Sequence, residues 1–197
     1  IPLMTPFFET EGERASLQSL TWGRKSDWIP TFCGTAGSLA VEGMLLAPVG
    51  ERGFLYQLTV RSTSDKPLSS TFGLEGCWAS AWHCVNEDKE IDGARRCYTS
   101  LWNDSLIFDM RCGLPLFAFA PMMDQPCSST FQETDAGIVY RLAHACTLEP
   151  GEAVTVTFYW GVGFEEVAAA TSAKEMLRQG WQHELQVTTD WLDARRW

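Results

Sequence analysis

The sequence is poor in basic residues and in histidine. It holds 15 Lys and Arg against 25 Asp and Glu, for a net charge of −10, and only 3 His. A chain of this charge repels phosphate backbones and anionic lipid headgroups. No apolar run reaches the length of a membrane-spanning helix. We therefore expect neither nucleic acid nor a membrane among the partners.

Motifs of metal and cofactor chemistry are also missing. Zinc sites pair cysteines two to four residues apart, and the closest two of the 7 cysteines here, Cys77 and Cys84, are farther apart than that. The GxSxG, GxGxxG, HExxH and P-loop patterns do not occur. We expect no cofactor and no metal.

The cysteines lack the close spacing of a disulfide-bonded scaffold, and their number is odd. A chain of 197 residues can bury a stable core without disulfides. Mostly reduced thiols are therefore predicted, which favours a cytoplasmic protein. Because the chain begins at Ile1 rather than Met, secretion after removal of a signal peptide stays open as an alternative.

The sequence is rich in aromatic residues and in short runs that alternate apolar and polar residues. It contains 9 Trp and 11 Phe, whose rings must be buried in a core, an interface or a ligand site. In residues 53–62, Phe54, Tyr56, Leu58 and Val60 share one face, which predicts a half-buried strand. Residues 68–76, 98–112, 114–121 and 128–134 indicate further strands or hairpins, whereas the first thirty residues look irregular.

Two runs near the end of this region are the clearest. Residues 136–148 and 152–163 both alternate, and the Pro150–Gly151 turn between them predicts a hairpin. The predicted fold class is therefore mainly β, an antiparallel β-sandwich of residues 1–163. An amphipathic, linker-like region of one or two C-terminal α-helices follows in residues 164–197.

The helical region is predicted from its composition and from one stripe of residues. It contains no proline and is dense in helix formers. Ser172 and Glu175 match the S-x-x-E capping box and predict a helix start there. The apolar stripe then consists of Leu177, Trp181, Leu185, Thr188 and Leu192. Trp191 and Trp197 add further aromatic surface near the end of the chain.

The order of these runs is similar to a known arrangement. It begins with EGMLLAPVGERGFLYQLTVRSTSDKPLSSTFGLEG and continues with YRLAHACTLEPGEAVTVTFYWGVGFEEVAAATSAKEMLRQGW. Over residues 38–197 the chain resembles the N-terminal β-supersandwich and linker helix of six-hairpin glycosidases, whose catalytic domain is an (α/α)6 barrel. The resemblance implies a sandwich fold, a supersandwich-like one, and a helix that leads to such a barrel.

The resemblance also implies what this chain would lack. In these glycosidases the acid and base carboxylates belong to the barrel, so we assign no catalytic residue. The implied partner is a helical barrel packed against the tryptophan face of the C-terminal helix. Two alternatives stay open: the helix folds back on its own sandwich, or it covers the sandwich of a second copy in a homo-oligomer.

One local cluster has the composition of a sugar site. Trp78 and Trp82 lie four residues apart and are followed by His83 and several acids. Aromatic rings stack on sugar faces while carboxylates bind hydroxyls. The alternative is that both Trp residues belong to the core and the acids to a solvated loop. With Trp102 and Asp109 from the next hairpin, the candidate ligand-binding set is Trp78, Trp82, His83, Trp102 and Asp109.

Three functions are compatible with these observations. The first is a non-catalytic sandwich domain or fragment of a carbohydrate-active glycoside hydrolase, bordering the sugar site. The second is a free-standing isomerase or cyclase that binds an apolar small molecule in an aromatic-lined pocket. The third is a carbohydrate-binding module, which binds sugar without turnover. The expected ligand is accordingly a carbohydrate or another small molecule.

Overall fold

The computed structural model describes residues 3–79, 81–86, 89–101, 105–111 and 117–195. In this part of the chain, antiparallel strands precede two helices. The strands are β1 (Thr5–Thr10), β2 (Glu13–Ala15), β3 (Leu17–Lys25), β4 (Ile29–Ala36), β5 (Leu39–Leu46), β6 (Gly53–Ser62), β7 (Leu68–Ala79), β8 (Ala81–Asn86), β9 (Lys89–Thr99), β10 (Leu106–Arg111), β11 (Phe117–Met123), β12 (Ser128–Thr134), β13 (Gly137–Leu148) and β14 (Ala153–Gly163). The helices are α1 (Glu166–Gln179) and α2 (Trp181–Asp193).

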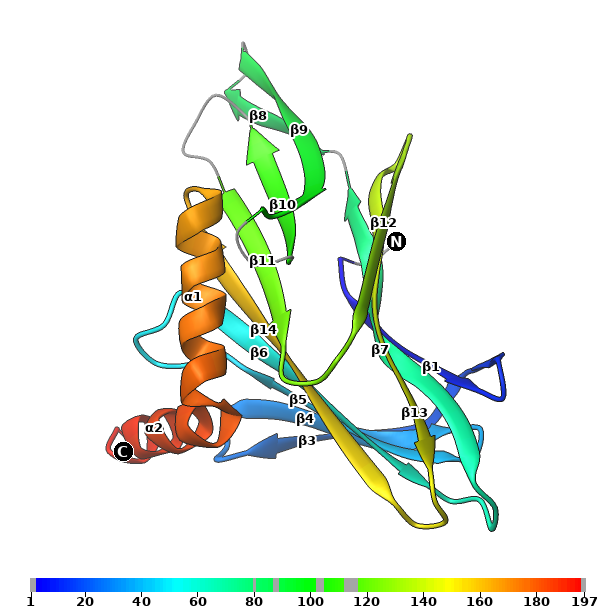
Figure 1. Cartoon of the computed structure of the whole chain (residues 1–197). Coiled ribbons are helices and arrows are strands. Elements are labelled where there is room, and N and C mark those ends of the chain that lie inside the picture. The colour runs from blue at the N-terminus through cyan, green and yellow to red at the C-terminus, as the bar shows by residue number, and fades with distance from the viewer. Residues whose placement is uncertain (1–2, 80, 87–88, 102–104, 112–116, 196–197) are drawn as a thin grey trace.

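The strands form two sheets that face each other. One sheet has five strands in the order β12-β13-β7-β1-β2, and the other has nine in the order β3-β4-β5-β6-β14-β11-β10-β9-β8. Both helices lie on the face of the nine-stranded sheet that points away from the five-stranded one (Figure 1). The predicted fold class, an antiparallel β-sandwich followed by one or two C-terminal helices, is confirmed, and the helices are two.

The core lies between the two sheets and is built by strand alternation. Leu58 and Val60 of β6 pair with Val156 and Val154 of β14, and all four face Phe72 and its neighbours on the five-stranded sheet. The predicted face of β6, which also includes Phe54 and Tyr56, is therefore confirmed. Burial of these side chains is the main favourable term that holds the two sheets together.

Helix α1 packs closely on β14 because alanines of the helix meet glycines of the strand. Its buried face consists of Ala169, Ala170, Ala173 and Met176. A Cβ atom added to Gly161 of β14 would lie 2.0 Å from the carbonyl oxygen of Ala169, so only glycine permits this approach. The close contact covers the outer side of β14, β11 and β10.

Helix α2 folds back on the same sheet of its own chain. Gly180, at φ 84°, ends α1, and the backbone N–H of Trp181 then donates to the Tyr159 hydroxyl at 3.1 Å. Leu185 is buried in a second cluster with Ile29, Met44, Leu46, Leu55, Tyr159 and Met176, against which Leu177, Trp181 and Leu192 are also packed. The predicted stripe therefore faces the sheet. In this chain the helix folds back on its own sandwich, which was the first alternative to packing on a barrel.

The N-terminal segment differs from the expectation. Residues 5–25, expected to be irregular, form β1, β2 and β3. β3 is an edge strand whose residues are exposed along most of its length, so it shows no period of two in hydrophobicity. Exposed positions of this kind carry no pattern that a sequence can reveal. β1 lies inside its sheet, but its two buried residues, Phe7 and Phe8, are consecutive and therefore give no alternation either.

The predicted hairpin of residues 136–148 and 152–163 is wrong. β13 pairs with β7 and β12, whereas β14 pairs with β6 and β11, so the two strands belong to different sheets. Pro150 and Gly151 do make a tight reversal, closed by the bond from Glu152 N–H to the Glu149 carbonyl at 2.9 Å. A tight reversal serves equally for a hairpin and for a connection between facing sheets, and alternation alone cannot distinguish them.

The predicted capping box is also wrong. Helix α1 begins at Glu166, so Ser172 lies inside it, and its hydroxyl donates to the Arg52 carbonyl at 2.7 Å. Glu175 instead pairs with Arg178 three residues later. The S-x-x-E pattern is short enough to occur inside a helix, where a serine hydroxyl can bind a neighbouring segment.

Candidate functional sites

Trp78, from the predicted ligand-binding set, lies between the two sheets. It is 8% exposed and packs edge to face on Phe119, with ring centroids 4.9 Å apart. The guanidinium carbon of Arg95 lies 4.8 Å from the centre of the Trp78 ring. Its indole N–H has no hydrogen-bond partner within the described part of the chain. Trp78 thus belongs to the aromatic core where β7 faces β9–β11.

Asp109 lies on the opposite side of the nine-stranded sheet. Its neighbour Phe108 is in the core with Trp78, whereas Ile107 packs with Ala169 and Ala170 of α1. Strand alternation therefore directs Asp109, which is 5% exposed, to the α1 side. The sheet separates Trp78 from Asp109, and the structure does not bring these two predicted residues together.

The other three members of the set lie in a part that is only partly described. The backbones of Trp82 and His83 lie on β8, opposite Asp92 and Ile91 of β9. Their side chains, and all of Trp102, are outside the described residues. Their role in ligand binding stays a prediction.

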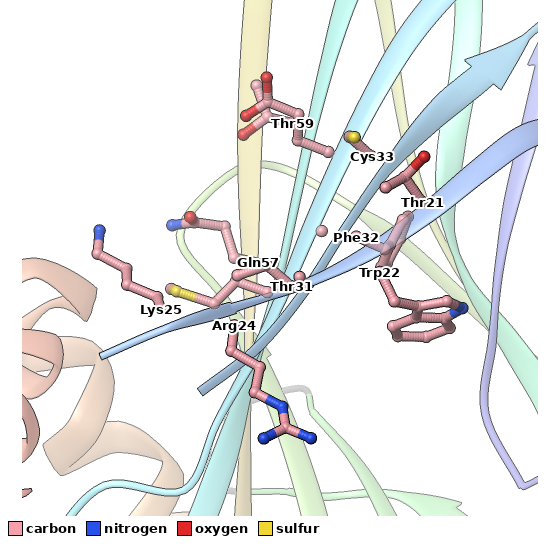
Figure 2. Close-up of a pocket in the computed structure, with 13 residues that line it drawn as sticks. Thr21, Trp22, Arg24, Lys25, Thr31, Phe32, Cys33, Gln57 and Thr59 are labelled. Carbon is pink, nitrogen blue, oxygen red and sulfur yellow. The ribbon is translucent and has the colours of Figure 1, made fainter. Parts of the chain in front are cut away.

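A polar depression lies on the outer face of the nine-stranded sheet, beyond the helices. Its volume is about 460 Å³, and it is lined by residues of β3, β4, β5 and β6. Lys25, Cys33, Gln57 and Thr59 project to this side, whereas Trp22 and Arg24 project to the other (Figure 2). The register aligns Thr21, Cys33, Glu42 and Thr59 in one row across the four strands.

The depression offers hydrogen bonds of several kinds. Lys25 provides an ammonium group, Glu42 a carboxylate, and the threonines provide hydroxyl groups. Thr59 already shares a hydrogen bond of 2.8 Å with Thr155, and the Gln57 amide donates to the Thr157 hydroxyl at 3.3 Å. These groups suit a polar surface or a polar ligand, and only Glu42 among the lining residues is an acid.

An apolar cleft lies on the inner side of the same strands, where the sheets diverge. Two adjoining cavities of about 400 and 410 Å³ share Trp22, Phe32 and Tyr56. Trp22 is 67% exposed, and Phe32 and Tyr56 pack against the core. The Tyr56 hydroxyl is protonated at neutral pH and can donate, and burial raises its pKa further, to about 12. The volume and lining resemble those of small-molecule pockets.

Neither Trp22 nor Tyr56 was among the predicted ligand-binding residues. Trp22 stands on the edge strand β3, which was not predicted to be a strand, and Tyr56 was assigned to the core face of β6. Both lie on the face that the core uses, but where the opposite sheet no longer covers it. Only the arrangement of the two sheets could identify such a position.

The five described cysteines are free thiols, and the pKa of two of them is raised to about 12. The five are Cys33, Cys77, Cys97, Cys127 and Cys146, and burial raises the pKa of Cys97 and Cys127, which disfavours the reactive thiolate. Within the described residues no group of three or more His, Cys, Asp or Glu could hold a metal ion. No helix in the same part of the chain has the length and apolar character needed to cross a membrane.

Glycoside hydrolysis generally requires two carboxylates on either side of the scissile bond. Each of the four cavities described for this chain is lined by at most one acid, Glu42 in the polar depression and Glu75 in a cavity on the five-stranded sheet.

Comparison with known proteins adds information on the fold. No protein-family model and no curated protein matches the sequence. Among solved structures, a protein assigned as a kojibiose phosphorylase from the human microbiome matches with a TM-score of 0.65 and 11% identity over 95% of this chain. A bacterial glucoamylase in complex with acarbose matches with a TM-score of 0.55 and 9% identity over 97% of this chain.

These two matches extend over nearly the whole chain but over only part of the other proteins. This chain spans 27% of the phosphorylase and 31% of the glucoamylase. Both are six-hairpin glycosidases, so the resemblance in fold that the sequence indicated is confirmed. At these identities the likeness concerns the fold.

Proposed function

We propose that this chain is a non-catalytic sandwich domain of a carbohydrate-active enzyme, which packs on a helical barrel and borders its sugar site. The observation that carries the proposal is the match of nearly the whole chain to about a third or less of two carbohydrate-active enzymes. A domain with one acid at most in each described cavity also suits a role outside the chemical step.

Two surfaces support packing against a further domain. Val187 and Trp191, four residues apart on α2, are 39% and 41% exposed on the side away from the sheet. The polar depression beside the helices leaves part of the outer sheet face uncovered. Together they offer an apolar anchor with a polar surround, which is the usual composition of a domain interface.

A turnover assay tests the non-catalytic role. The 197-residue chain, incubated with maltose, kojibiose and a nitrophenyl α-glucoside, with and without inorganic phosphate, is expected to release no more product than buffer. Release of glucose or glucose phosphate in proportion to protein concentration would refute the role. Glu42→Gln and Glu75→Gln variants would then identify which acid is responsible.

The apolar cleft favours a second candidate, a free-standing enzyme that binds an apolar small molecule. Trp22, Phe32 and Tyr56 supply aromatic walls and one hydroxyl donor. In a fluorescence titration with 1-naphthol, this candidate predicts a blue shift of tryptophan emission that is lost in Trp22→Ala. The sandwich-domain proposal predicts no saturable response, and Trp28→Ala, which removes another exposed Trp (69%), serves as the matched control.

A further inference from the structure

A row of polar side chains crosses the outer face of the five-stranded sheet. Thr130, Arg141, Glu75 and Thr5 occupy directly opposed positions on β12, β13, β7 and β1. Neighbouring strands lie about 4.8 Å apart, so the row extends over about 14 Å. A cavity of about 600 Å³ lies along it. This is a shallow site that spans four strands rather than a deep pocket.

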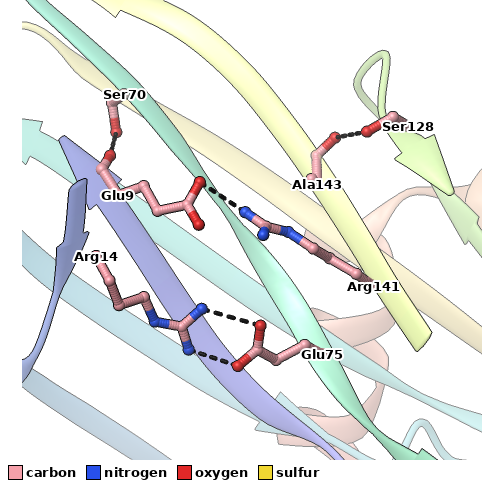
Figure 3. Close-up of polar contacts among 7 residues, drawn as sticks. All are labelled: Glu9, Arg14, Ser70, Glu75, Ser128, Arg141 and Ala143. Atoms are coloured by element: carbon pink, nitrogen blue, oxygen red, sulfur yellow. Dashed lines mark hydrogen bonds and ion pairs between the residues drawn. The ribbon is translucent and has the colours of Figure 1, made fainter. Parts of the chain in front are cut away.

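The two charged members of the row are fixed by neighbouring groups. Arg14 donates to both carboxylate oxygens of Glu75, and Arg141 Nη2 lies 2.6 Å from Glu9 Oε2 (Figure 3). Both guanidinium groups also lie over the ring of Phe7, with Cζ atoms 4.0 Å (Arg141) and 5.2 Å (Arg14) from its centre. Phe7 is 1% exposed, so its ring lies buried beneath the guanidinium groups of the two arginines.

The charges of this site balance. Two arginines face two glutamates, so an anion or a cation would gain attraction from one pair of charges and meet repulsion from the other. Arg141 keeps donors beyond the one that binds Glu9, and the Glu75 oxygens keep free lone-pair directions. A neutral ligand that both donates and accepts hydrogen bonds satisfies such a surface.

The edge of the site adds neutral polar and apolar groups. Thr130 and Gln132 are exposed on the edge strand β12, where they offer a hydroxyl and an amide. Val139, 38% exposed, lies beside Gln132 and offers an apolar contact. Alternating hydroxyl partners and small apolar contacts match the hydroxyl groups and C–H faces of a sugar chain.

We infer that this row binds a neutral oligosaccharide of two or three sugar units across β12, β13, β7 and β1. The sugar class rests on the proposed function, while the position and the neutral charge rest on the geometry. The site lies on the sheet opposite to the helices, away from the surface proposed to pack on a barrel. It would hold a carbohydrate to the domain without turning it over.

Calorimetric titration with maltohexaose, cellohexaose and xylohexaose tests the site. At least one of these probes should bind the 197-residue chain. Thr130→Ala/Gln132→Ala leaves both arginine–glutamate pairs intact and should weaken that binding about tenfold or more, since two hydrogen bonds to the sugar are lost. The matched control is Gln18→Ala/Thr35→Ala, an exposed pair on β3 and β4 of the other sheet, which should bind as the wild type does.

Three results would overturn the site: no heat with any probe at millimolar concentration, equal weakening in both double variants, or tighter binding of hexagalacturonate than of the neutral probes. Equal melting temperatures of the two variants show that folding is not the cause of any difference. Any of these three results would overturn the oligosaccharide site but would leave the sandwich-domain proposal intact. Conversely, sugar turnover by the chain alone would refute that proposal and leave this binding site in place.

Discussion

Substitution of Leu185 by alanine tests whether α2 is held by its own sheet. Leu185 is 8% exposed and packs in the cluster of Ile29, Leu55, Tyr159 and Met176. The change removes three buried carbon atoms, worth about 0.8 kcal/mol each, and leaves a cavity. Because the cluster lies beneath a surface helix that can partly close the cavity, we expect a loss of about 2–4 kcal/mol in the free energy of unfolding.

The matched control is Val187→Ala, two residues along the same helix. Val187 is 39% exposed on the other side of α2, so its truncation should change the free energy of unfolding by no more than about 0.5 kcal/mol. Urea unfolding followed by circular dichroism measures both variants. In a thermal scan the Leu185→Ala variant should melt about 4–16 °C lower, given about 2–4 °C per kcal/mol for a chain of this length.

Equal losses in the two variants would refute the docking of α2 described above. The same would follow if the amides of residues 185–192 exchanged with deuterium as fast in the wild type as in Leu185→Ala. In either case the stripe of α2 would be free to meet another domain, and the contacts of Trp181 and Leu185 with the sheet would carry no stability.

Three further perturbations address other contacts. Gly161→Ala places a Cβ 2.0 Å from the Ala169 carbonyl oxygen, so α1 must shift, and the variant should lose about 1–3 kcal/mol or fail to fold; a melting temperature equal to the wild type would contradict the close packing of α1 on β14. Glu184 is 3% exposed, and burial, followed by the charge of Glu51, raises the pKa of its carboxyl group. A carboxyl group whose pKa is raised by folding stabilises the fold at low pH and loses that contribution as pH rises through the raised pKa. Glu184→Gln should therefore melt at a higher temperature than the wild type at pH 7 but not at pH 4, and a lower melting temperature at pH 7 would oppose this account. Finally, iodoacetamide on the native protein should label the exposed Cys33 well before Cys97, whose thiol has a pKa of about 12, as read by peptide mass spectrometry; equal rates would show that Cys97 is accessible.

Local patterns predicted the strands that face the core. The alternation of Phe54, Tyr56, Leu58 and Val60 and the helical stripe that includes Leu185 both depend on burial of one face, which the sequence displays directly. The edge strand β3 has no buried face to display, and β1 buries the consecutive residues Phe7 and Phe8, so neither strand was recognised from alternation. A local hydrophobic pattern therefore reveals which positions are buried, but it does not reveal which strands pair with one another.

Pairing between distant strands decides where the candidate sites lie. Arg141 and Glu75 become neighbours because β13 pairs with β7, and Thr5 joins them because β1 pairs with β7 on the other side. Nothing in the local sequence of these residues specifies that register. For the same reason the sequence grouped Trp78 with Asp109, which the nine-stranded sheet separates. The Pro150–Gly151 turn shows the same limit, since its strands enter different sheets.

The intact mass of the native polypeptide from its source, measured under denaturing conditions, tests the proposed domain role most directly. If the chain is one domain of a larger carbohydrate-active enzyme, the mass should be about three to four times the 22.0 kDa of these 197 residues, as the shares of the two matched enzymes indicate. A native mass near 22.0 kDa would contradict the domain role and would favour a protein that acts through the apolar cleft at Trp22.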